Sequence, residues 1–169
     1  MKKIITTLIF TGTLLSAGGF AQIGAGYSKD DNSGDTGSAF VGLNVLGNLG
    51  LRLEYAKNIT EHPEFSKEDI SRYGVFATYT LPLFSAFSIT PKVGLTKSEG
   101  SFTVKGVRDE VSDSSTTFTY GLEANYHYND AISLFVGYTD YDNKFDNIPS
   151  VKASELDSKN YTFGIKIDI

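Results

Sequence analysis

The sequence predicts an all-β fold: a closed eight-stranded antiparallel up-and-down transmembrane β-barrel, with short periplasmic turns and four longer extracellular loops. Three observations lead to this prediction. Apolar residues recur at period two from residue 22 onward, and no window keeps the spacing of an amphipathic helix. The connections between the alternating segments are short and long in turn. Aromatic residues gather towards both ends of the apolar faces, which is typical of a membrane barrel.

The first 21 residues have the pattern of a secretory signal peptide, which leaves 22–169 as the predicted outer-membrane β-barrel domain. Lys2 and Lys3 precede an apolar, Thr-rich stretch, and Gly19 and Ala21 place small side chains at the cleavage site. The apolar stretch is too short, and too rich in Thr and Gly, for a transmembrane helix. Cleavage after Ala21 leaves 13 basic and 20 acidic residues, so the net charge becomes −7 instead of −5.

The first four predicted strands each present a row of apolar residues on one face. They cover residues 22–28, 37–46, 49–56 and 72–81, with a tight turn at 47–48 between the second and the third. Their apolar rows are, in order, Ile23, Ala25 and Tyr27; Ala39, Val41, Leu43 and Val45; Leu49, Leu51, Leu53 and Tyr55; and Tyr73, Val75, Ala77, Tyr79 and Leu81.

The last four predicted strands repeat the pattern. They cover residues 86–96, 116–128, 131–141 and 161–169, with short turns at 82–85 and 129–130. Their apolar rows are Phe87, Ile89, Pro91, Val93 and Leu95; Phe118, Tyr120, Leu122, Ala124 and Tyr126; Ile132, Leu134, Val136 and Tyr138; and Tyr161, Phe163, Ile165, Ile167 and Ile169. Because Pro91 has no backbone N–H to donate, it predicts a bulge or one unpaired carbonyl in its strand.

The lengths of the connections distinguish the two ends of the predicted barrel. Residues 29–36, 57–71, 97–115 and 142–159 form long connections, and those between them are of hairpin length. This alternation predicts short turns at one end of the barrel and long loops at the other, as in outer-membrane barrels. Strands of about ten residues also suit a tilted membrane crossing. A soluble barrel with an apolar interior would show the same period of two, so the faces must be distinguished by other features.

Glycine and aromatic residues indicate which face is inside. Glycines cluster on the polar face, and an eight-stranded barrel has a narrow interior, so the polar face is predicted to line the lumen. On the apolar face, one group of aromatics lies at the long-loop ends and another near the short turns. The first group is Tyr27, Tyr55, Tyr73, Phe118, Tyr138 and Tyr161, and the second is Tyr79, Phe87 and Tyr126. Two such girdles around an aliphatic belt indicate a membrane-spanning surface.

The charged residues of the polar face form a predicted barrel-interior network. Its members are Arg52, Glu54, Arg72, Lys92, Glu123, His127, Lys166 and Asp168. Buried charges are tolerated when they are paired and hydrogen-bonded. The network is either an ion path or a structural plug of salt bridges. Because eight strands enclose just enough room for side chains, the plug is the favoured interpretation.

The signal peptide, the strand count, the loop asymmetry and the closing segment "YTFGIKIDI" resemble the small eight-stranded outer-membrane barrels of Gram-negative bacteria. These are of the OmpA-transmembrane-domain, OmpX/Ail and opacity-protein type. The resemblance implies an outer-membrane location and contact with the lipid bilayer, with lipopolysaccharide and with the barrel assembly machinery. It also implies an assembly signal in the last strand, matched here by Gly164, Ile167 and Ile169. Phe163 stands where that signal usually has a polar residue, and Ile169 replaces the usual terminal aromatic.

Composition narrows the functional classes. The negative net charge argues against a nucleic-acid partner. The absence of Cys excludes a disulfide, a thiolate zinc site and a Cys nucleophile. The acidic stretches "KDDNSGD" and "DYDNKFDN" are incomplete as calcium loops, because both lack the full ligand spacing. We therefore expect no metal, no cofactor and no catalytic residues.

Two enzyme classes share the predicted architecture. The lipid A deacylases need a Ser with a His and an acid, but His127 has no Ser close by in sequence, and His62 lies in a long connection. The lipid A palmitoyltransferases need an apolar interior, whereas this one is charged. A lipid-modifying enzyme is therefore the least favoured function.

The expected function is that of a non-enzymatic, monomeric outer-membrane barrel. Its loops would serve interaction, adhesion or envelope integrity, with a host or envelope protein as partner. The alternative is a narrow porin-like channel for small solutes or ions. In the third long connection, "SFTVKGV" at residues 101–107 is expected to extend a hairpin above the membrane. An exposed strand edge there could pair with a partner.

Overall fold

The computed structural model describes residues 21–30, 35–60, 65–104, 110–141 and 158–169, and strands account for almost all of these described residues. The strands are β1 Ala21–Asp30, β2 Asp35–Leu46, β3 Leu49–Asn58, β4 Phe65–Tyr79, β5 Leu81–Phe84, β6 Phe87–Val104, β7 Glu110–His127, β8 Ile132–Tyr141 and β9 Ser158–Asp168. The predicted signal peptide, apart from its last residue Ala21, lies outside the described residues, as do His62 and parts of the four predicted long loops. No helix in the described part is long and apolar enough to span a membrane.

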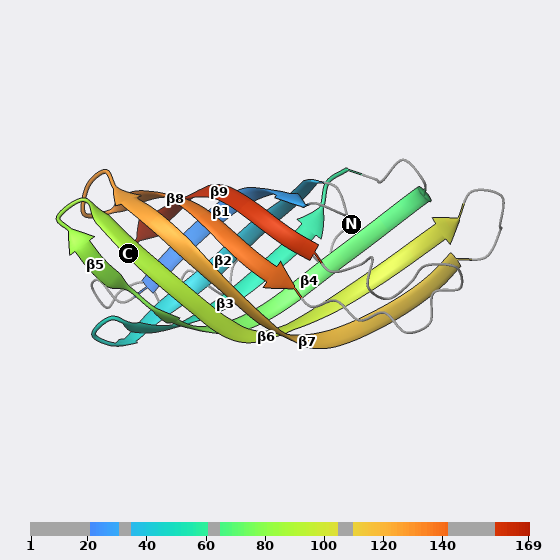
Figure 1. Ribbon diagram of the computed structural model, residues 1–169, viewed down its shortest axis with the longest axis horizontal. Coiled ribbons are helices and arrows are strands. Elements are labelled where there is room, and N and C mark those ends of the chain that lie inside the picture. Colours follow the sequence, from blue (N-terminus) through green and yellow to red (C-terminus); the bar gives the residue numbers. More distant parts are fainter. Residues whose placement is uncertain (1–20, 31–34, 61–64, 105–109, 142–157) are drawn as a thin grey trace.

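The strands form a closed barrel in which sequence neighbours pair antiparallel and β1 pairs antiparallel with β9 (Figure 1). The sheet runs in the order β4-β3-β2-β1-β9-β8-β7-β6-β5, and an additional β4–β6 pairing joins its ends. Since β4 and β5 follow one another along β6, the nine elements make eight barrel strands. The predicted fold class, a closed eight-stranded antiparallel barrel, is confirmed.

The break between β4 and β5 lies opposite Pro91. Pairing with β6 stops at Thr78–Lys92 and resumes at Leu81–Ile89 in the same register. The proline therefore interrupts the ladder without a bulge at that point. The N–H of Thr80 donates to the carbonyl of Asn48, 2.8 Å away, so this donor is satisfied from the other side.

The two faces of each strand differ in exposure, and the polar face is the buried one. In β3, Leu51 and Leu53 are 53% and 62% exposed, whereas Arg52 between them is 3% exposed. The same inversion of the soluble pattern recurs around the barrel. An apolar outer surface and a polar lumen are the arrangement that a lipid environment requires.

Three strands continue past the barrel at the long-loop end. Residues 97–115 and 57–71 were expected to be loops, but β6 runs to Val104, β7 begins at Glu110 and β4 begins at Phe65. Apolar alternation is absent here, because the strands leave the lipid and are rich in Ser, Thr and charged residues. The expected hairpin extension is present, with Thr103 paired to Glu110. We call residues 65–70, 97–104 and 110–116 the protruding sheet, in which Lys97 is paired with Thr116. Val107 lies outside the described residues.

Candidate functional site

Phenylalanine rings fill much of the lumen, and glycines make room for them. Phe40 and Phe135 point inward and meet edge to face, with ring centroids 5.9 Å apart. A Cβ on Gly24 would lie 2.2 Å from the Phe40 ring, and one on Gly164 would lie 2.5 Å from Phe135. The lumen is therefore narrow enough that these backbone positions accept no side chain.

Glu123 on β7 is the centre of the charged network. Both of its oxygens accept from the guanidinium of Arg52 on β3, and the longer of these hydrogen bonds is 3.1 Å. The ammonium of Lys166 on β9 donates to Oε2 at 2.5 Å, and that of Lys92 on β6 lies 3.9 Å from Oε1. All four side chains are at most 4% exposed. Three cations from three other strands thus surround one carboxylate.

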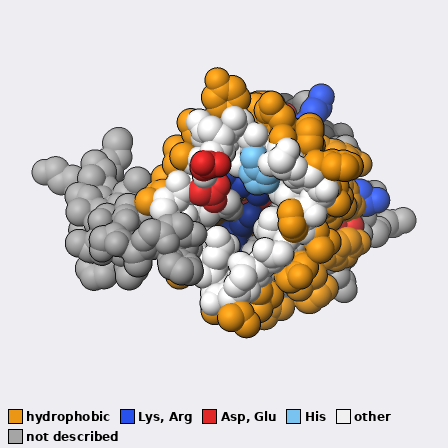
Figure 2. Space-filling view, turned by 90° about the vertical axis from the view of Figure 1, so that its left-hand side faces the viewer, with side chains coloured by type: hydrophobic (Ala, Val, Ile, Leu, Met, Phe, Trp, Pro, Cys, Tyr) orange, Lys and Arg blue, Asp and Glu red, His pale blue; other side chains and the backbone are white. Residues whose placement is uncertain are grey.

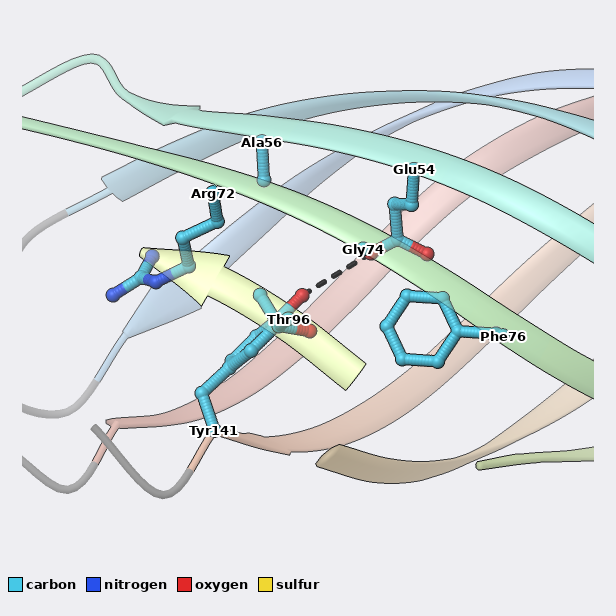
Figure 3. A pocket seen from close by; sticks show the side chains of 7 residues that line it. All are labelled: Glu54, Ala56, Arg72, Gly74, Phe76, Thr96 and Tyr141. Carbon is cyan, nitrogen blue, oxygen red and sulfur yellow. Dashed lines mark hydrogen bonds between the residues drawn. The ribbon is translucent and has the colours of Figure 1, made fainter. Parts of the chain in front are cut away.

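Glu54 on β3 extends the network towards the loops. Its Oε2 accepts from Lys92 at 2.9 Å. Its Oε1 accepts from the hydroxyl of Tyr141 at 3.1 Å, the hydrogen bond drawn in Figure 3. Arg52 and Glu54 share a strand face but do not pair with each other. Each is instead tied to other strands, so the network links the barrel wall across the lumen. Such pairing offsets the cost of burying the charges.

Aromatic rings also contact the buried cations of the lumen. The guanidinium of Arg52 lies 4.1 Å from the Phe40 centroid. The ammonium of Lys166 lies 4.8 Å from the centroid of Phe135. Arg72, near the long-loop end, is 2% exposed and lies 5.1 Å from the ring of Tyr141 (Figure 3). These cation–π contacts stabilise charges that have left water.

His127 lies at the short-turn end of the lumen, as its strand position predicted. Its Nε2 is 2.9 Å from Ser88 Oγ and its Nδ1 is 2.8 Å from Ser133 Oγ. Asn125 donates to Ser88 at 3.2 Å and accepts from Lys166 at 2.6 Å, which joins His127 to the central network. The absence of a nearby Ser in sequence was thus misleading, because two serines meet the imidazole in space.

The Ser88–His127 pair has the spacing of a nucleophile and base but not the surroundings. Ser88 is 2% exposed, so a substrate has no access to its hydroxyl. The other ring nitrogen contacts a serine, where catalytic triads place an acid. Asp168 instead accepts from Gln22 at 2.8 Å and joins no cation of the network. Among the described residues, no group of three His, Asp or Glu side chains is arranged to hold a metal ion.

A vestibule opens the lumen from the short-turn end and stops at the network. Its volume is about 160 Å³, and its lining includes Gln22, Thr78, Thr90, His127 and Asp168, with Arg52 at its inner end. Figure 2 looks into this opening and shows basic side chains at its depth. Beyond, the cavity beside Glu54, Lys92 and Glu123 has a volume of about 10 Å³. That is barely enough for one water, so the described part of the lumen is plugged there.

The network separates the predicted interior residues into two groups. Arg52, Glu54, Lys92, Glu123 and Lys166 are joined by direct contacts, whereas Arg72, His127 and Asp168 lie towards the two ends. The lumen-facing Phe40, Phe135 and Tyr141 were not predicted from the sequence. All three stand out of phase with the apolar rows of their strands, and that signal could have placed them inside.

The closing strand lies between β1 and β8. Gly164 faces the lumen beside Phe135, and Ile167 faces outward and is 40% exposed. The N–H of Ile169 donates to the carbonyl of Ala21 at 2.8 Å. The first and last described segments therefore meet at one seam. A role of Gly164, Ile167 and Ile169 in assembly stays a prediction.

Comparisons with known proteins agree with this architecture. The family described as "Outer membrane protein beta-barrel domain" matches residues 10–167. A comparison with curated proteins gives no match.

Three solved structures are similar over 89% of this chain. The N-terminal β-barrel domain of Pseudomonas aeruginosa OprF has a TM-score of 0.68 and 11% identity over 98% of its own chain. Neisserial surface protein A has a TM-score of 0.63 and 18% identity over 96% of its chain. Ail, the attachment invasion locus protein of Yersinia pestis, has a TM-score of 0.57 and 16% identity over 97% of its chain. At these identities the likeness shows the fold alone.

Proposed function

Because the chain belongs to the outer membrane protein β-barrel domain family, we propose that it is a non-enzymatic surface-interaction protein whose protruding sheet binds an extended segment of a partner protein. A barrel of this family lies in the bilayer of the outer membrane. The lumen supports no large-solute traffic, since its described centre is filled by the charged network. The parts of the molecule that remain available for function are those outside the membrane.

The observation that carries the proposal is the pairing of β7. Along residues 110–118, β7 pairs with β6 on one edge, and its pairing with β8 begins only at Thr119. Among the described strands, none forms a ladder with the other edge of this segment. An unpaired edge presents a row of N–H and C=O groups that an extended peptide can join as a further strand.

The edge formed by β4 is partly closed, which makes β7 the better docking edge. Pairing between β3 and β4 ends at Lys57–Ser71. The next N–H on β4, that of Ile70, donates to the side-chain oxygen of Asn58 at 2.8 Å. This side-chain cap occupies a donor that an added strand would need. On β7, no described strand pairs with this edge before Thr119, so its main chain is the favoured surface.

Proline substitution tests this edge directly. Adjacent residues of a strand direct their N–H groups to opposite edges. One of the two variants Ser115→Pro and Thr116→Pro therefore removes a donor from the free edge, and the other removes a donor from the β6 ladder. We expect the free-edge proline to lower adhesion of producing bacteria to cultured epithelial cells severalfold. Alanine at the same position is the matched control. Unchanged adhesion, with barrel content equal by heat-modifiable gel mobility, would contradict the proposal.

A narrow channel is the second candidate, favoured by the vestibule that reaches Arg52. The plug interpretation expects no steady single-channel steps in a planar bilayer. Steps that disappear on altering Arg52 or Glu54 would support the channel instead. Lipid A mass spectrometry with and without the protein tests the enzyme alternative, and unchanged lipid A is the expected result.

A further inference from the structure

Charged residues mark the outer boundary of the apolar belt. On three strands a lysine stands two residues beyond a girdle tyrosine, on the same outward face and towards the long loops: Lys29 after Tyr27, Lys57 after Tyr55, and Lys159 beyond Tyr161. Lys97, Asp35 and Asp140 occupy the corresponding outward level on other strands. We call these six residues the outer charge ring: Lys29, Asp35, Lys57, Lys97, Asp140 and Lys159.

The lysines of the ring fall into two kinds. Lys57 pairs with Asp69 at 2.9 Å, and Lys97 pairs with Glu99 at 2.7 Å. Lys29 and Lys159 are exposed, and neither has an ion pair or hydrogen bond to any residue of the described chain. Two of the four ammonium groups are thus paired with a carboxylate, and the other two have no such partner among the described residues.

The acidic members of the ring are held by tyrosines. Asp140 faces Lys159 across the β8–β9 pairing, yet its carboxylate accepts from Tyr120 at 3.0 Å and from Tyr138 at 2.9 Å. Asp35 faces Lys29 across the β1–β2 pairing, and its carboxylate interacts with the hydroxyl of Tyr27. Both carboxylates interact with tyrosine hydroxyls, and neither pairs with the lysine opposite it.

Lys29 and Lys159 lie close together at the β1–β9 seam. Lys29 is directly opposite Tyr161 in the strand pairing, and Lys159 is two residues from Tyr161 on the same face. Such diagonal neighbours are about 7–8 Å apart. Two flexible lysine side chains at that spacing can reach a single phosphate group between them.

At the opposite rim of the apolar belt, the described residues include no matching ring of lysines. Near the short turns the described outward faces carry large apolar residues and neither Lys nor Arg: Leu83, Phe87, Tyr126 and Tyr128. Lysines at a membrane boundary lay their aliphatic stems on apolar surface and hold the ammonium at headgroup level, where tyrosines also sit. The asymmetry therefore assigns the lysines to the headgroups of the outer leaflet.

We propose that Lys29 and Lys159 bind a phosphate group of an anionic lipid headgroup in the outer leaflet, at the seam where β1 and β9 close the barrel. The site goes beyond the proposed binding of a protein partner and shares no residue with the protruding sheet. In this site the two lysine ammonium groups contact one phosphate group. The tyrosine rings of the girdle below them contact the acyl region of the lipid.

The test measures lipid retained by the purified barrel in native mass spectrometry, with lipid A and dephosphorylated lipid A as probes. The variants are Lys29→Gln, Lys159→Gln and the double variant. The matched control is the double substitution of the paired lysines, Lys57→Gln with Lys97→Gln. Heat-modifiable mobility confirms that each variant is folded. A separate arm adds inorganic phosphate as a competitor.

We expect lipid A to bind and its dephosphorylated form to bind weakly, with affinity falling about fivefold for each seam lysine removed. The control pair should change lipid A binding less than about twofold, since its charges are already compensated. Equal binding of both probes, or an equal loss in the control, would overturn the site. Displacement of lipid A by inorganic phosphate at equal concentration would show a free-phosphate site and overturn the lipid assignment.

Discussion

The lumen and the protruding sheet are built from the same strands but stabilised in different ways. In the lumen, charges are buried and each is tied to partners on other strands, as Glu123 is to Arg52 and Lys166. In the protruding sheet, Lys97 and Glu99 form an ion pair that is about half exposed on both sides. The difference teaches that one strand can carry a rigid structural segment and, a few residues on, a surface that is free to bind.

Removing the central carboxylate should give the largest difference between the two regions. Glu123→Ala leaves three buried cations without their shared partner, and breaking a buried pair in this way costs about 3–5 kcal/mol. We expect a large drop in the urea midpoint of barrel unfolding, followed by gel mobility. Glu99→Ala in the protruding sheet is the control and should leave the midpoint almost unchanged. A small effect of Glu123→Ala would mean that water or ions already compensate the lumen charges.

Adding one methyl group in the lumen should have the next largest effect. Gly24→Ala would place a Cβ 2.2 Å from the Phe40 ring, and overpacking of this kind costs about 1–3 kcal/mol. Gly42→Ala is the matched control, because its Cβ would find its nearest neighbour at 3.7 Å. Equal urea midpoints for the two variants would show that Phe40 moves aside freely.

Tyr141→Phe should have a moderate effect. It removes one hydrogen bond to the Glu54 carboxylate and keeps the ring beside Arg72. A hydrogen bond to a charged group contributes about 1.5–3 kcal/mol, and Lys92 still holds the carboxylate, so we expect the lower end of that range. Urea unfolding gives the value, and a stabilising change would contradict the assigned contact.

Lys97→Ala should have the smallest effect on unfolding, because exposed ion pairs are screened by water and salt. We expect a urea midpoint that is indistinguishable from that of the unsubstituted barrel at physiological ionic strength. If the variant unfolds much earlier, the protruding sheet stabilises the barrel, and the two regions are less independent than their contacts indicate.

Much of the fold could be predicted, because a lipid environment imposes a simple rule on each strand. Leu51, Arg52 and Leu53 already show it: apolar outside, polar inside. The rule fails beyond the membrane, so the extensions of β6 and β7 through Ser-rich segments were not predicted. Their pairing depends on backbone hydrogen bonds, which leave little trace in the pattern of side chains.

The membership of the network could be predicted, but its partners could not. Arg52 and Glu123 are 71 residues apart, and which residues face each other across the lumen depends on the stagger of the strands. Alternation determines whether a residue faces the lumen or the lipid. It does not determine the position of that residue along the barrel axis. Asp168 shows the consequence, since it was grouped with the cations but lies at the mouth with Gln22.

The seam between β1 and β9 also constrains how the chain reaches this state. Gln22 and Asp168, which pair across it, are 146 residues apart in sequence, so the final closure waits for nearly the whole chain. Every other neighbouring pair of strands can form as a local hairpin. Pairing of β1 with β9 instead requires closure of the longest loop, which has the largest loss of conformational entropy. Until it forms, two strand edges remain unpaired in a setting that tolerates neither. Among the strand pairings of the barrel, closure of the seam therefore carries the largest loop-closure entropy.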